Sequence, residues 1–139
     1  MSIKIGYDFD GVICESEPKP AKSYFKMKGD ERKLYNELSE AFEATAEIKI
    51  MPLQPCCIIT GRTLSYKEAT ETWLENHNIT QYKIFYNPYA ATRKNMITHK
   101  VSIIIKERIA VFYEDDPVIL KTLSRRIPEC NFFLVGEDL

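Results

Sequence analysis

The sequence lacks any long apolar run. No stretch approaches the roughly 20 consecutive apolar residues that are needed to span a bilayer. The first ten residues, MSIKIGYDFD, carry acids where a signal peptide would have its apolar region. We therefore expect a cytoplasmic protein with no membrane contact.

An excess of charge of one sign is also missing, because 19 basic and 20 acidic side chains leave a formal net charge of -1. This balance excludes a general attraction to the nucleic-acid backbone, so a phosphate-bearing partner must be recognised at a local site. We interpret the scattered cations as a solvated face rather than a nucleic-acid groove: Arg93, Lys94, Lys121, Arg125 and Arg126.

The four cysteines lack the C-x-x-C spacing that is typical of zinc sites. Cys56 and Cys57 are adjacent within an apolar run, and Cys14 and Cys130 stand alone. Free cysteine is among the most frequently buried residue types. We therefore expect four reduced, structural cysteines, with neither a zinc ion nor a disulfide framework.

Two patterns alternate regularly along the chain. Short apolar runs predict strands at 3–9, 55–60, 82–87, 110–113 and 131–135. Segments with helical spacing of apolar residues predict helices at 31–48, 65–78, 91–108 and 118–127. The alternation predicts one α/β domain over residues 1–139, with a Rossmann-like parallel five-stranded sheet and helices on both faces. Within it we expect Ala69 and Trp73 to face inward and His99 to lie at the surface.

Polar clusters directly follow three of the strand candidates. They are Asp8-Phe9-Asp10-Gly11, Thr60-Gly61-Arg62 and Glu114-Asp115-Asp116. In a parallel sheet the three clusters would meet at one edge, and Lys100 precedes the last of them on a predicted helix. Crowded carboxylates repel one another unless a cation neutralises them or some of them remain protonated. The pattern therefore predicts a site that binds Mg²⁺ and a phosphate together.

These clusters resemble the four motifs of the haloacid dehalogenase-like (HAD) superfamily. YDFDGVI resembles the first motif, IITGR the second and FYEDDP the acidic fourth, and Lys100 occupies the place of the third. All four occur in the family's order. The chain is similar to capless nucleotidases and polynucleotide phosphatase domains of that superfamily, which implies a magnesium-dependent phosphatase without a large cap domain.

The resemblance implies a role for each motif residue. Asp8 would attack phosphorus to give an aspartyl-phosphate, and Asp10 would act as general acid and then as general base. The carboxylates of Asp8 and Asp115, with the backbone carbonyl of Asp10, would hold Mg²⁺. Lys100 would neutralise the charge of the transferring group. The substrate phosphate would be bound by Thr60, Gly61 and Arg62.

Two assignments stay open. The fourth motif reads acid-acid-acid-Pro, whereas the capless relatives often read Asp-Asp-Arg-Pro. Glu114 or Asp116 could therefore replace Asp115 as the metal ligand. Lys94 and Lys106 compete with Lys100 for the role of active-site lysine.

Only about 45 residues separate the first two motifs, which leaves little room for a cap domain. Capless members of the family act on exposed phosphates of large substrates or on nucleotides, so we favour a nucleotide or a nucleic-acid terminal phosphate as substrate. Tyr24 and Phe25, in a predicted loop over 13–29, would be available to stack on a base. The alternatives are a catalytically silent phosphate- and Mg²⁺-binding regulatory module, and phosphoryl transfer to an acceptor other than water. The oligomeric state is left open.

Overall fold

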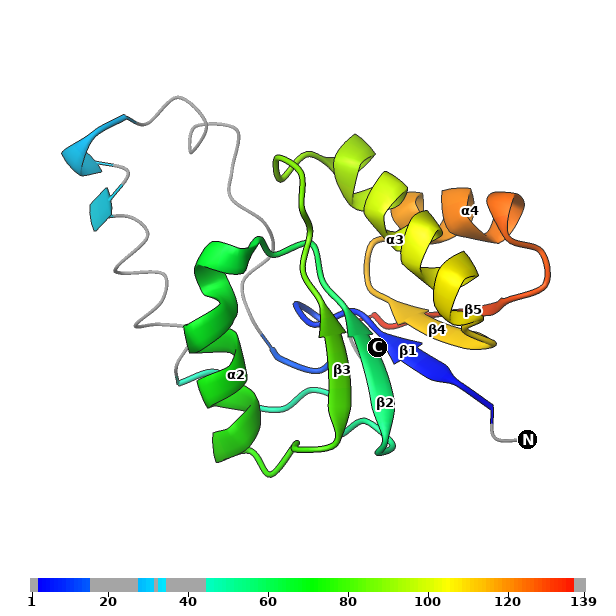
Figure 1. Cartoon of the computed structure of the whole chain (residues 1–139), viewed down its shortest axis with the longest axis horizontal. Helices are drawn as coiled ribbons and strands as arrows, with labels where there is room; N and C mark the ends of the chain where they lie inside the picture. Colours follow the sequence, from blue (N-terminus) through cyan, green and yellow to red (C-terminus); the bar gives the residue numbers. More distant parts are fainter. Residues whose placement is uncertain (1–2, 16–27, 32, 35–44, 137–139) are drawn as a thin grey trace.

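Five parallel strands form one sheet in the order β3-β2-β1-β4-β5 (Figure 1). The structure, a computed structural model, describes residues 3–15, 28–31, 33–34 and 45–136. The strands are β1 (Ile5–Tyr7), β2 (Cys56–Ile59), β3 (Tyr82–Phe85), β4 (Val111–Glu114) and β5 (Asn131–Leu134). The chain runs outward from β1 through β2 to β3 and then crosses back to β4 and β5. The order therefore reverses beside β1, at the position where parallel α/β sheets bind their ligands.

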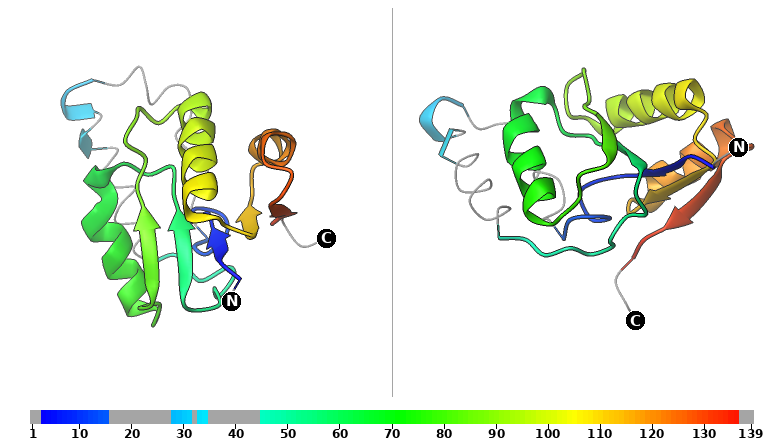
Figure 2. Two further views of the ribbon diagram at one scale, coloured as in Figure 1. Left: turned by 45° about the vertical axis from the view of Figure 1, so that its right-hand side comes forward. Right: turned by 60° about the horizontal axis from the view of Figure 1, so that its bottom comes forward.

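Helices cover both faces of this sheet (Figure 2). After the 3-10 turn η2 (Leu64–Tyr66), α2 (Lys67–Asn76) packs on one face, and Trp73 contributes to a core cluster with Tyr7 and Phe9. On the other face, α3 (Arg93–Glu107) and α4 (Pro117–Arg126) pack in a second cluster around Phe112. The predicted Rossmann-like α/β fold is confirmed, and the residues described include no large cap.

The buried position of β2 explains its sequence. All four of its residues are buried, because the strand lies between β1 and β3 and is covered on both faces. A strand of this kind shows a continuous apolar run rather than alternation. All four cysteines of the chain are free and buried.

Several sequence expectations need correction. Ala69 is exposed and Thr70 is buried in its place, because the first turn is a 3-10 turn and α2 begins only at Lys67. Residues 45–48 are not helical, and Ile48 instead forms an antiparallel bridge with Cys14. His99, expected at the surface, is 3% exposed because its helix face packs against the sheet.

Parts of two predictions lie outside the described residues. Of the helix expected at 31–48, Glu31, Lys33 and Leu34 are helical, and 35–44 are not described. The loop positions Tyr24 and Phe25 are also not described. No helix in the described part of the chain is long and apolar enough to cross a membrane.

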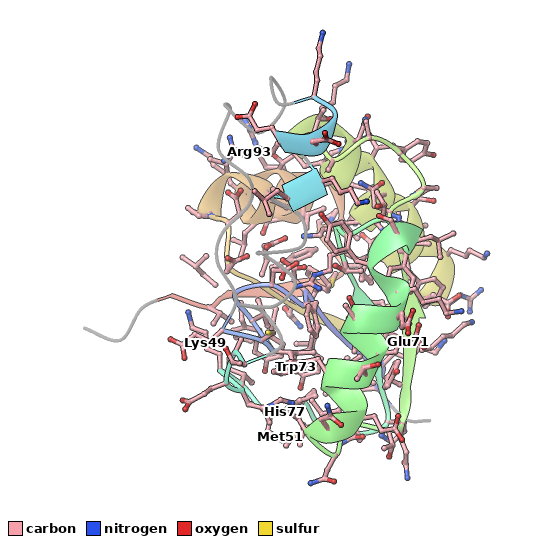
Figure 3. The ribbon with its side chains drawn as sticks, turned by 90° about the vertical axis from the view of Figure 1, so that its left-hand side faces the viewer. Lys49, Met51, Glu71, Trp73, His77 and Arg93 are labelled. Atoms are coloured by element: carbon pink, nitrogen blue, oxygen red, sulfur yellow. The ribbon has the colours of Figure 1, made fainter. Side chains whose placement is uncertain are left out.

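Figure 3 shows the outer side of α2. Trp73 and His77 lie on the side of the helix toward Lys49 and Met51, and Glu71 lies on the other side. The Trp73 indole stacks on the His77 ring with 3.9 Å between centroids, and its Nε1 donates to the carbonyl of Ala46 at 2.9 Å. The hydrogen bond to Ala46 ties the helix to the segment that leads into β2.

Candidate active site

The site begins where β1 ends. The Asp8 amide donates to the Tyr113 carbonyl at 3.0 Å, which extends the pairing of β1 with β4 by one residue and sets Asp8 beside Glu114. The chain then turns sharply, since the Phe9 carbonyl accepts from the amides of Val12, Ile13 and Cys14. The turn places the first polar cluster at the carboxyl edge of the sheet.

Asp8 is almost fully buried, with an exposed fraction of 3%. Its Oδ1 accepts from the Phe9 amide at 2.8 Å, and its Oδ2 lies 3.3 Å from the Lys100 ammonium. Burial raises the pKa of Asp8 well above its usual range, and the Glu114 and Asp115 carboxylates add to that rise against the opposing effect of Lys100. The carboxyl group is therefore held in a fixed orientation within a crowded acidic site.

Among the residues that the structure describes, Lys100 is the lysine that reaches this site. It lies on α3 with 1% of its surface exposed, and its Nζ donates to Glu114 Oε1 at 2.5 Å. Burial alone would lower the pKa of Lys100, but the Asp8 and Glu114 carboxylates outweigh it and raise that pKa. By contrast, Lys94 and Lys106 are exposed.

Glu114 pairs with the lysine and with the following turn. Its Oε2 accepts from the amides of Asp115 at 2.9 Å and Asp116 at 3.2 Å. Burial opposes its charged form, yet the Lys100 ammonium and side-chain hydrogen bonds with Asp8, Lys100 and Asp115 lower the pKa of Glu114 to about 2. Because Lys100 lies closer to Glu114 than to Asp8, the charge of Glu114 is the better stabilised of the two.

Asp8, Glu114 and Asp115, here called the acidic cluster, bring one carboxylate oxygen each to within 4.8 Å of one another. Gly11 leaves the space that Asp115 fills. A Cβ at Gly11 would collide with the Asp115 carboxylate, at 2.7 Å from its Cγ, and the backbone there has a φ of +77°, which glycine adopts without strain. The first and fourth motifs thus meet directly.

Asp116 has a different place. Its side chain caps α4 by accepting from the amides of Val118 and Ile119 at 2.9 and 3.3 Å. Arg93 Nε donates to its other oxygen at 3.2 Å. Asp116 therefore belongs to the helix start rather than to the acidic cluster.

The second motif follows β2 on the neighbouring side of β1. Thr60 is fully buried, and its Oγ1 accepts from the Arg62 amide at 3.0 Å. Gly61 lies against Met96, whose sulfur would be 3.0 Å from a Cβ at that position. Asn87 supports the loop, because its amide donates to the Arg62 carbonyl at 2.8 Å and its side chain to the Gly61 carbonyl at 3.3 Å.

Arg62 turns its guanidinium toward the first motif. Its Nη2 lies 2.6 Å from Asp10 Oδ1 and its Nε lies 2.9 Å from Asp10 Oδ2, which makes a two-pronged ion pair. Its Nη1 donates to Thr70 on α2 at 3.0 Å. The structure therefore brings together the first and second motifs through Asp10 and Arg62.

The electrostatics of the acidic cluster favour a cation. Lys100 is shared between Asp8 and Glu114, so a single positive charge faces two carboxylates. The Asp115 carboxylate lies beside them and adds to the rise in the pKa of Asp8. A divalent cation among the three oxygens would relieve this repulsion and keep Asp8 in its charged form.

Three supporting residues have no distinguishing pattern in the sequence. Thr70 and Asn87 lie in a helix and a loop, and only their contacts with Arg62 and Gly61 reveal them. His99 precedes Lys100, and its Nε2 lies 3.1 Å from the Phe85 carbonyl, so it ties α3 to the end of β3. The burial of His99 distinguishes it from a surface residue, but the sequence around one helical position does not reveal whether that position is buried.

A comparison with solved structures found a related fold. A chain in the structure of the Pnkp1/Rnl/Hen1 RNA repair complex superimposes with a TM-score of 0.64 at 14% sequence identity, over 96% of this chain and 42% of that chain. The present chain thus spans less than half the length of that neighbour, and the likeness concerns the fold. No protein-family model matches the sequence, and no curated protein matches it either.

Proposed function

We propose that the protein is a magnesium-dependent phosphomonoester hydrolase of the HAD-like superfamily that acts through an aspartyl-phosphate on Asp8. The observation that carries this proposal is the arrangement around Asp8. One carboxylate at the end of β1 lies 3.3 Å from a buried lysine and within a cluster of two further acids. The four motifs of the resemblance supply these residues in the expected order.

The donor set fits a small divalent cation. Mg²⁺ prefers oxygen ligands at about 2.1 Å, so two oxygens on opposite sides of one ion lie about 4.2 Å apart. The oxygens of the acidic cluster lie within 4.8 Å of one another. A small side-chain rotation or a bridging water would make up the difference between the two distances. Asp8 and Asp115, with the Asp10 carbonyl, would hold the ion, while Glu114 stays with Lys100. When bound, Mg²⁺ would neutralise the clustered carboxylates and polarise the phosphoryl group.

The side chains of the chain itself account for the reaction steps. A carboxylate oxygen of Asp8 attacks phosphorus as the bond from phosphorus to the ester oxygen breaks, and Asp10 gives a proton to the leaving oxygen. Asp10 then takes a proton from the water that cleaves the aspartyl-phosphate, which releases phosphate and restores Asp8. Lys100 neutralises the transferring group, and the Thr60 hydroxyl and Gly61 amide bind its oxygens.

The proposed substrate is a nucleotide or a nucleic-acid terminal phosphate. Two observations favour it: the similarity of the motifs to capless nucleotidases and polynucleotide phosphatase domains, and a fold shared with a chain of an RNA repair complex. No large cap encloses the site among the residues described, so a phosphate at the end of a long chain would have access to it.

The test is release of inorganic phosphate, with Mg²⁺ and with EDTA, from mononucleotides, 3′- or 5′-phosphorylated oligonucleotides, sugar phosphates and phosphopeptides. We expect Mg²⁺-dependent release that is lost in Asp8→Asn. Asp116→Asn is the matched control, because it also removes one carboxylate, while asparagine keeps the caps on the amides of Val118 and Ile119. This control should retain turnover.

Two results would contradict the proposal. Phosphate release by Asp8→Asn at the wild-type rate would remove Asp8 as the nucleophile. Absence of release from every substrate, with Mg²⁺ binding intact, would favour a silent phosphate- and Mg²⁺-binding module.

A further inference from the structure

Arg62 makes a more elaborate set of contacts than a phosphate ligand needs. Its guanidinium meets both oxygens of Asp10, at 2.6 Å from Nη2 and 2.9 Å from Nε. The same group donates to Thr70 Oγ1 at 3.0 Å and lies 4.7 Å from the centroid of the Phe9 ring. A paired carboxylate, a hydroxyl and an aromatic face together define the position of one side chain.

Burial makes this position rigid. Only 8% of the Arg62 side chain and 25% of the Asp10 side chain are exposed. A planar guanidinium that binds a carboxylate with two parallel hydrogen bonds sets the orientation as well as the place of that carboxylate. The partner Thr70 is fully buried on α2, so the contact also links Asp10 to the helix layer of the fold.

We propose that Arg62 is a positioning residue that holds the Asp10 carboxyl in place for proton transfer, rather than a ligand of the substrate phosphate. This inference rests on the proposed function, in which Asp10 exchanges a proton with the leaving oxygen. A general acid must come within about 2.6 to 3.2 Å of the oxygen that it protonates. The two hydrogen bonds from the Arg62 guanidinium fix the orientation of the Asp10 carboxyl, on which that approach would depend.

The two roles of Arg62 predict different kinetics. Loss of a phosphate ligand weakens binding of every phosphomonoester, whatever its leaving group. Loss of a positioned general acid slows the formation of the aspartyl-phosphate from substrates with poor leaving groups, which need the proton, and spares this step for good leaving groups. The parameter that reports this step is kcat/KM, because the later hydrolysis, in which Asp10 acts as base, is the same for every substrate. The comparison of p-nitrophenyl phosphate with a nucleoside 5′-monophosphate therefore separates the roles.

For Arg62→Gln we expect kcat/KM on the nucleoside monophosphate to fall about 100-fold, at the lower end of what general acid catalysis contributes. The fall of kcat/KM on p-nitrophenyl phosphate should be less than about 10-fold. Arg62→Lys should recover part of the lost activity, since lysine keeps the positive charge but lacks the planar guanidinium that makes two parallel hydrogen bonds. An equal fall of kcat/KM for both substrates would overturn the proposal, because loss of a phosphate ligand predicts that result.

Two further variants act as controls. Thr70→Val preserves volume and removes the hydroxyl that accepts from Arg62, and it should show the same leaving-group dependence in weaker form. Arg93→Gln removes another arginine paired with an aspartate, Asp116, but its side chain is 58% exposed and lies outside the site. This variant should leave both substrates unaffected, and a leaving-group effect of the Arg62 kind in it would overturn the proposal.

A measurement without turnover keeps the inference separate from the proposed function. In urea unfolding, Arg62→Gln and Asp10→Asn should shift the midpoint by less together than the sum of their separate shifts, because each removes the same pair. Additive shifts would overturn the pairing. If the wild-type protein releases no phosphate from any substrate, the proposed function fails, and this cycle still decides whether Arg62 holds Asp10.

Discussion

Asp8 and Glu114 compete for the same lysine. Lys100 Nζ lies 2.5 Å from Glu114 and 3.3 Å from Asp8, and all three side chains are buried. Removing one member of a buried ionic group leaves the remaining charge without compensation, which costs more than the pair itself contributes. We therefore expect Glu114 to act mainly on the stability of the site.

At the scale of single residues we expect Glu114→Gln to lower the free energy of unfolding by about 3 kcal/mol, since the Lys100 charge loses its nearest partner. Urea denaturation measures this change. Glu129→Gln, at an exposed position, is the control and should change stability by less than about 0.5 kcal/mol. Equal stability of Glu114→Gln and the wild type would show that Lys100 does not depend on Glu114.

Gly11 makes a second prediction at this scale. Gly11→Ala drives a Cβ into the Asp115 carboxylate and strains a backbone with φ of +77°. Gly29→Ala has the backbone cost alone, about 1 kcal/mol, because its φ is +59° and nothing lies within 4 Å. We expect Gly11→Ala to lose more stability than Gly29→Ala in thermal unfolding and to lose Mg²⁺ binding as well. If the two variants lose similar amounts of stability, the whole effect of Gly11→Ala would come from the strained backbone and not from the contact with Asp115.

At the scale of elements, the start of α4 separates two neighbouring acids. Asp116 caps the helix and Pro117 occupies its first turn, where proline is well tolerated. Asp115, one residue earlier, turns back to Gly11 and the acidic cluster. The helix start thus divides one acidic run into a capping residue and a candidate metal ligand.

This division is testable by paired substitutions. Asp116→Ala should lower stability by about 1 kcal/mol, the usual effect of losing an N-cap, and should leave phosphate release unchanged. Asp115→Ala should abolish Mg²⁺-dependent release. Denaturation and phosphate assays on both variants provide the comparison, and loss of release in Asp116→Ala alone would reverse the assignment.

The charge of the whole molecule bears on how a metal affects its stability. The net charge of -1 is small, so the meeting of three acids at one edge of the sheet is a local feature. A ligand that binds the folded state alone stabilises it by about 2.7 kcal/mol at a concentration 100 times its Kd. Mg²⁺ should therefore raise the melting temperature, and EDTA should reverse the rise.

Asp115→Asn should abolish this shift, while Asp116→Asn should preserve it. Differential scanning fluorimetry at increasing Mg²⁺ measures the effect for the wild type and both variants. An equal shift in Asp115→Asn would place the metal elsewhere.

The sheet and most helices were predictable because their signals are local. Continuous apolar runs and helical spacing are set by residues close together in the chain, and they located all five strands within a few residues. Which side of a helix faces the core was harder to predict from sequence, and the predictions for Ala69 and His99 were wrong. Each depends on where a helix begins or what packs on it, which neighbouring residues do not encode.

Sequence alone decides which residue types gather at the carboxyl edge of the sheet: acids after β1 and β4, and a hydroxyl, a glycine and an arginine after β2. How these residues pair comes from the tertiary fold. Lys100 pairs with Glu114 and Asp8, and Arg62 pairs with Asp10. Asp116 caps the helix that it precedes. The reason is physical: hydrogen bonds and ion pairs depend on distances of about 3 Å between side chains far apart in sequence, and folding alone sets those distances.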